Sequence, residues 1–92
     1  MPLTIQKARE DWSSREKLDL QRLHTAYPPP DYEIECSLTE EGDPWCVVRD
    51  CVRDTIIVHI ARIGNRYVVA HPERNIRRRV AQMRTAVDLV VQ

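Results

Sequence analysis

The chain has 92 residues, which is enough for one domain with a small core. The formal net charge is zero, and charged residues make up 30% of the chain, which has no low-complexity tract; this argues for an ordered domain and against a disordered chain. There are two glycines, Gly42 and Gly64, so a glycine-rich phosphate-binding loop is excluded.

The N-terminal residues and the number of cysteines indicate the cellular compartment in which the protein is expected. No apolar run approaches the roughly 18 residues of a membrane span, and the first eleven residues lack the apolar core of a signal peptide. Three cysteines, an odd number, favour free thiols over a disulfide framework. We therefore expect a cytoplasmic protein in which Cys36, Cys46 and Cys51 are free thiols, with no membrane contact, no cofactor and no bound metal.

The charges are unevenly distributed along the chain. Residues 32–54 hold seven acidic and two basic residues, a net charge of −5, whereas residues 55–92 hold seven arginines and two acidic residues, a net charge of +5. The simpler interpretation is that the two halves face each other in the fold or are solvated. The functional interpretation is a pair of complementary surfaces for partners.

The first 27 residues have helical periodicity. Ser13 and Glu16 have the spacing of a capping box, so we expect one long helix or two short ones joined at Ser13. The three prolines at 28–30 end this region and form a rigid connector. One stripe at a spacing of 3.6 residues, with Glu16 as its polar gap, contains Ile5, Ala8, Trp12, Leu20, Leu23 and Tyr27.

Four strands are predicted next, at residues 32–38, 45–51, 55–63 and 66–71. The first alternates polar and apolar residues, and the third is apolar on both faces, so it should be central. Gly64 and Asn65 form a two-residue hairpin turn, in which Gly64 should have a positive φ. Pairing through this turn puts Ile60 opposite Val69. The same register gathers six residues on the other face: Ile57, His59, Ala61, Ile63, Val68 and Ala70.

A C-terminal helix is predicted to begin at Pro72 or, alternatively, after an N-cap at Asn75. Its apolar stripe contains Ile76, Val80, Met83, Val87 and Val90 or Val91. The expected fold for residues 1–92 is therefore a single α+β domain. It comprises an N-terminal helix or helix pair, a four-stranded antiparallel β-meander and a C-terminal amphipathic helix.

Catalytic and metal-binding patterns are weak. Cys46 and Cys51 point to opposite faces of one strand, and His59 and His71 fall on opposite faces of the hairpin, so no zinc-ligand spacing is present. A cysteine nucleophile would need Cys46 or Cys51 beside His59 or His24. A small enzyme with such a Cys/His site is the weakest of the functional alternatives.

The preferred function is a non-enzymatic protein-binding or regulatory module that uses an apolar sheet face and an arginine-rich C-terminal helix. If both helices pack on one side of the sheet, the other face stays exposed and can pair with a protein partner or with a second copy, as a homodimer. The residues predicted to bind the partner are Trp45, Ile57, His59, Ile63, Arg66 and Val68. The alternative is a nucleic-acid-associated regulator that contacts phosphates through Arg74, Arg77, Arg78, Arg79 and Arg84.

Overall fold

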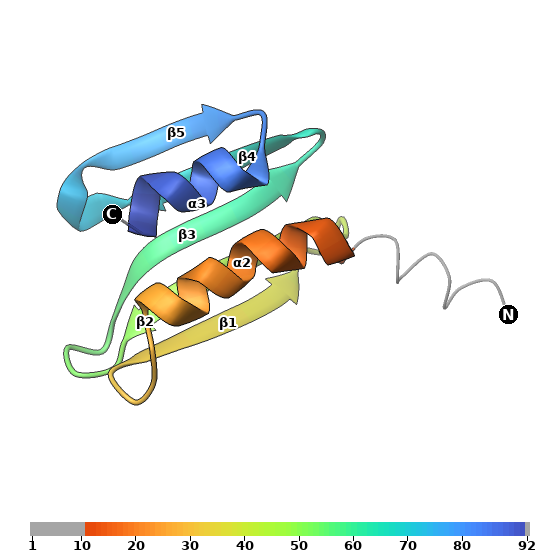
Figure 1. Cartoon of the computed structure of the whole chain (residues 1–92). Coiled ribbons are helices and arrows are strands. Elements are labelled where there is room, and N and C mark those ends of the chain that lie inside the picture. Colours follow the sequence, from red (N-terminus) through yellow and green to blue (C-terminus); the bar gives the residue numbers. More distant parts are fainter. Residues whose placement is uncertain (1–10, 92) are drawn as a thin grey trace, which may run out of the picture.

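The computed structural model describes residues 11–91. In this range it is an α+β fold in two layers, with helices α2 (Ser14–Ala26) and α3 (Met83–Val91) over one face of a five-stranded antiparallel sheet (Figure 1). Neither helix is long and apolar enough to cross a membrane. The strands lie side by side in chain order, so β3 is central and β1 and β5 are the edges: β1 (Tyr32–Leu38), β2 (Pro44–Asp50), β3 (Thr55–Ile63), β4 (Arg66–His71) and β5 (Ile76–Val80).

Helix α2 begins where the capping box was predicted. The backbone N–H of Glu16 donates to Ser13 Oγ at 3.1 Å, and the N–H of Ser13 donates to Glu16 Oε1 at 2.7 Å. These two bonds satisfy backbone donors that the helix itself leaves unpaired. The earlier part of the predicted stripe, Ile5 and Ala8, lies outside the described residues.

The core lies between the helices and the sheet. Helix α2 contributes Leu20 and Leu23, and its end is tied to α3 because the Tyr27 hydroxyl donates to the carbonyl oxygen of Val90. Each fully buried aliphatic side chain stabilises the fold by about 1.5–3 kcal/mol. The members of the core cluster from the sheet and α3 that are at most 1% exposed are Cys46, Val48, Val58, Ile60, Val69, Ala86, Val87 and Val90.

The β3–β4 hairpin has the predicted register. Ile60 pairs with Val69, Arg62 pairs with Tyr67, and Ile63 pairs with Arg66. Gly64 has a φ of +65°, as predicted. A side chain there would meet no steric neighbour within 4 Å, so glycine is favoured at this position by the backbone conformation alone.

The prediction of four strands is wrong, because residues 76–80 form strand β5 and not the start of the C-terminal helix. A short 3-10 helix, η1 (Pro72–Arg74), is capped by Asn75, whose φ of +58° is a left-handed conformation that asparagine tolerates. The chain turns back there, and Ile76 pairs with His71. Ile76 and Val80 are four residues apart, so they fit both a helical stripe and one face of a strand.

A bulge in β3 changes the predicted faces of the sheet. Val48 pairs with Val58 but Arg49 pairs with Ile56, so Ile57 is the extra residue. Ile57 is 4% exposed and belongs to the core, whereas Ile56 is 40% exposed. The prediction that Ile57 shares a face with His59 is therefore wrong, because the extra residue shifts the alternation by one position.

Candidate protein-binding face

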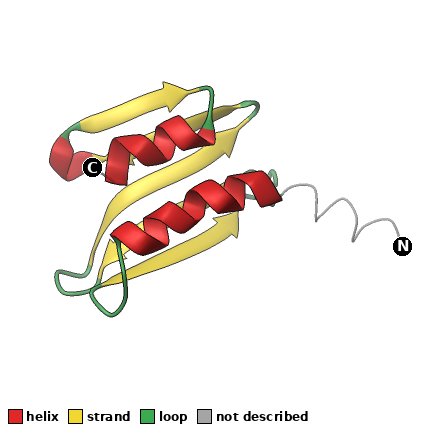
Figure 2. Cartoon of the chain, in the orientation of Figure 1, coloured by secondary structure: helices red, strands yellow, loops and turns green. Residues whose placement is uncertain are grey.

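The sheet face that points away from both helices is uncovered in the described chain (Figures 1 and 2). We call this the open face. Side chains alternate between the two faces along a strand, so the register defines its members. Two rows cross the three inner strands at its centre, Val68–Ala61–Trp45 and Ala70–His59–Val47.

The centre of the open face is apolar, and His59 is its one polar member. Val47 is 6% exposed, yet it does not belong to the core cluster between sheet and helices. Ile63, farther along β3, is 55% exposed. Of the residues predicted to bind a partner, the structure places five on this face and excludes Ile57; the five are Trp45, His59, Ile63, Arg66 and Val68.

The two edges of the open face carry opposite charges. Glu33 and Glu35 lie on edge strand β1, and Arg77 and Arg79 lie on edge strand β5. Glu33 is within 3.9 Å of Arg49. Among residues 11–91, by contrast, Glu35, Arg77 and Arg79 form no ion pair and no side-chain hydrogen bond. Unpaired charges of opposite sign therefore flank an apolar centre.

The predicted arginine-rich helix does not exist. Arg74 lies in η1, residues 77–79 lie on β5, and Arg84 lies on α3. Because a strand alternates its side chains, Arg78 points to the helix side while its two neighbours point to the open face. The five arginines that were predicted to contact phosphates are thus divided between the two sides of the sheet.

A buried carboxylate joins helix α2 to the β3–β4 hairpin. Glu16 is 6% exposed. Its Oε1 accepts from Arg62 Nη1 at 2.6 Å, and its Oε2 accepts from the Tyr67 hydroxyl at 2.6 Å. Arg62 also lies over the ring of Trp12, with 5.8 Å from Cζ to the ring centroid. The sequence held a signal for this cluster, since the predicted register puts Arg62 opposite Tyr67 and Glu16 interrupts the apolar stripe.

The electrostatics of this cluster indicate a structural role. Burial raises the pKa of Glu16, but the hydrogen bonds from Tyr67, Ser13 and Arg62 outweigh burial, so the pKa lies below its ordinary value of 4.5. Burial, with the hydrogen bond to Glu16, raises the pKa of Tyr67 to about 12. Glu16 therefore stays ionised and Tyr67 stays protonated at neutral pH. Both carboxylate oxygens already accept hydrogen bonds, so this group is poorly placed to act as a general base.

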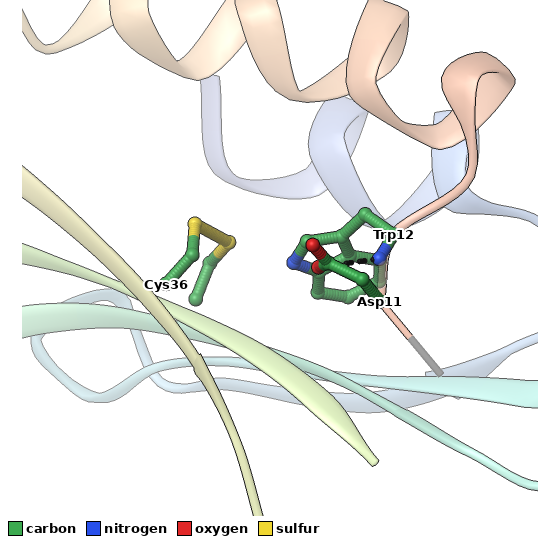
Figure 3. The surroundings of a disulfide bond; sticks show 4 residues. Asp11, Trp12 and Cys36 are labelled. Atoms are coloured by element: carbon green, nitrogen blue, oxygen red, sulfur yellow. Dashed lines mark hydrogen bonds between the residues drawn. A yellow bond between two sulfur atoms is a disulfide. The ribbon is translucent and has the colours of Figure 1, made fainter. Parts of the chain in front are cut away.

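The cysteine prediction is wrong for two of the three residues. Cys36 and Cys46 are direct cross-strand partners on β1 and β2, with their Cα atoms 4.3 Å apart, and they form a disulfide. Trp12 lies beside this bond under helix α2 (Figure 3). Cys51 is free and exposed. An odd number of cysteines leaves one thiol unpaired but does not prevent the other two from pairing.

With Cys46 in the disulfide, the candidate thiol is Cys51, and of its two possible bases only His24 shares a pocket with it among the described residues. Cys51 and His24 both line a pocket of about 310 Å³, together with Tyr27 and Tyr32. In the described chain no hydrogen bond joins the Cys51 thiol to His24, and an activated thiol needs such a base. No group of three or more His, Cys, Asp or Glu residues within 11–91 could hold a metal ion.

Comparisons with known proteins give no further direction. No protein-family model matches the chain, no curated protein matches it, and no solved structure matches it. The functional argument therefore depends on the geometry described above.

Proposed function

We propose that this chain is a non-enzymatic protein-binding module whose contact surface is the open face of its sheet. One observation carries the proposal. Both helices cover the same face (Figure 1), and the register gives the uncovered face an apolar centre. An antiparallel sheet face that stays in water normally carries polar side chains. The open face has Val, Ala and Trp at those positions instead.

The distribution of residue types supports a protein partner. Interfaces between proteins have an apolar centre, a charged rim and an enrichment in tryptophan and arginine. Here Trp45 lies within the central rows, and Arg66 and Arg79 lie at the rim. This arrangement suits a flat protein surface better than a small molecule, which needs a concave site.

A pair of matched variants tests the proposal. Val68→Glu places a charge in the centre of the open face, where it would be buried by a partner. Val52→Glu makes the same change at a residue that is 78% exposed in the β2–β3 turn. Both variants should fold, because neither residue belongs to the core cluster, and circular dichroism would confirm this.

The readout is binding to the wild type and to the two variants. Proteins captured from nuclease-treated host lysate are identified by mass spectrometry, and their affinities are then measured with purified components. We expect a partner, a second copy of this chain included, that loses at least about tenfold in affinity with Val68→Glu and binds Val52→Glu normally. Equal binding to all three chains would contradict the proposal.

A further inference from the structure

The charges and register of the open face point to its occupant. We infer that the partner is a second copy of this chain, docked face to face about a two-fold axis that runs parallel to the strands. This inference rests on the proposed function, because it names the partner of the same face. A closed two-fold pair requires a surface that is complementary to itself.

The opposite charges at the two edges provide that self-complementarity. A two-fold axis parallel to the strands, near central strand β3, exchanges the two edges of the sheet. The acidic edge β1 of one copy then lies over the basic edge β5 of the other, twice in each dimer. An axis perpendicular to the strands would instead place each edge over itself, and like charges would oppose one another.

The register specifies which charges meet. One row crosses the whole sheet from Glu35 on β1 to Arg77 on β5, with His59 at its middle. The two-fold axis runs parallel to the strands, above the middle of this row and between the two sheets, so rotation about it places the row of one copy over the same row of the other. Each copy's Glu35 therefore faces Arg77 of the other copy. Packed sheets are about 10 Å apart, a gap that the two long side chains can bridge.

The size of the face limits the strength of the dimer. Five strands spaced at about 4.8 Å, each about 20 Å long, give a footprint of about 500 Å² for each copy. The pair would bury about 1,000 Å², which is at the low end for specific complexes. We therefore expect a dissociation constant in the micromolar range, and solution measurements need to extend to hundreds of micromolar.

A different assembly could also use the opposite edges, through addition of β5 of one copy to β1 of the next. Such contacts join different surfaces, so they produce filaments or, where the rotation between copies closes, rings. They would also leave the apolar rows around Val68 and Trp45 uncovered. The face-to-face dimer covers these rows and is closed, so the observations favour it.

Charge reversal tests the pairing of Glu35 with Arg77. Glu35→Arg puts like charges together twice in the dimer, and Arg77→Glu does the same with the opposite sign. Each variant alone should dimerise at least about tenfold more weakly than wild type in sedimentation velocity. An equimolar mixture of the two should form heterodimers, because each contact then joins opposite charges. Glu40→Arg, in the β1–β2 turn, and Arg78→Glu, on the helix side of β5, make the same charge changes and should leave the dimer unchanged.

The outcomes separate the inference from the proposed function. Unweakened dimers of the single variants, concentration-dependent filaments or rings, or a wild type that stays monomeric at hundreds of micromolar would each overturn the inference. In the last case the Val68→Glu comparison still decides the proposed function, since loss of a different protein partner would support it. If that variant also loses no partner, both are wrong.

Discussion

Glu16 is in contact with Ser13, Arg62 and Tyr67, and its role follows from its position. It caps the start of α2 through Ser13 and holds Arg62 and Tyr67 of the hairpin. A buried carboxylate is costly unless its oxygens accept several hydrogen bonds. The cluster therefore ties the start of α2 to the β3–β4 hairpin.

Glu16→Gln is expected to lower the free energy of unfolding by about 2 kcal/mol at neutral pH, because a charged acceptor of three donors becomes neutral. The folded pKa of Glu16 lies below its ordinary value of 4.5. Its contribution is thus complete above that value and is lost as the pH falls through the folded pKa. Denaturant unfolding from about pH 6 to about pH 3 should show that the difference in the free energy of unfolding between wild type and Glu16→Gln becomes smaller as the pH falls.

The control for this experiment is Glu40→Gln, at an exposed residue in the β1–β2 turn. It should leave stability unchanged at every pH. The difference in the free energy of unfolding between wild type and Glu16→Gln could instead stay constant down to the lowest pH. That result would show that the ionised form of Glu16 is not what stabilises the fold.

The conformation of an individual residue could be predicted where it depends only on its neighbours in sequence. The capping box at Ser13 and the positive φ at Gly64 follow from the chemistry of one turn, and both were predicted correctly. For Glu16 the sequence held only part of the answer. The predicted register pairs Arg62 with Tyr67, but these residues are 46 and 51 positions away from Glu16, and their contact with it depends on how the helix packs.

Among the elements, strand β2 is held from both sides. It pairs with β1 and β3, and the Cys36–Cys46 disulfide joins it covalently to β1 across a separation of ten residues. A cross-link of this length removes freedom mainly from the unfolded chain. It therefore anchors edge strand β1, which carries the acidic edge of the open face.

Cys36→Ser should lower the free energy of unfolding by about 3 kcal/mol, the loop-closure value for a short cross-link. Reducing agent should destabilise wild type by a similar amount and leave Cys36→Ser unaffected. Titration of thiols in the unreduced, denatured protein should find one free group, Cys51. Three free thiols in protein purified without reductant, or a stability that reductant does not change, would contradict the cross-link.

Because of the bulge in β3, Ile57 lies in the core while its neighbour Ile56 is exposed. Ile57→Ala should cost about 2–4 kcal/mol because it opens a cavity in the core, whereas Ile56→Ala should cost less than about 1 kcal/mol. Thermal or denaturant unfolding of the two variants provides the comparison. If the two variants lost equal stability, or if Ile56→Ala lost more, the result would indicate that Ile57 lies on the same face as His59.

The elements were predictable to the extent that their periodicity was unambiguous. The first four strands and the hairpin register follow from alternation and turn chemistry, and the structure agrees. Residues 76–80 were assigned to a helix because Ile76 and Val80 satisfy both periods. A bulge is a pairing irregularity between two strands, so the sequence of β3 alone could not reveal it.

At the scale of the whole molecule, the layer arrangement determines the candidate site. The two helices pack on each other and on one face of the sheet (Figure 1). The Tyr27 hydroxyl at the end of α2 donates a hydrogen bond to the carbonyl oxygen of Val90 in α3. The sequence predicted most of the residues on the uncovered face. It also predicted the opposite charges of the two halves, but it placed the arginines on a helix, so their position at the sheet edge emerged only from the fold.

The measurement that most directly tests the role of the open face is a concentration series of ¹H–¹⁵N NMR spectra, from about 10 µM to about 1 mM, a range that brackets a weak interface. We predict concentration-dependent shifts at Trp45, Val47, His59, Val68 and Ala70, with little change along α2 and α3. Spectra that stay constant over this range, or shifts concentrated on the helices, would contradict self-association through the open face.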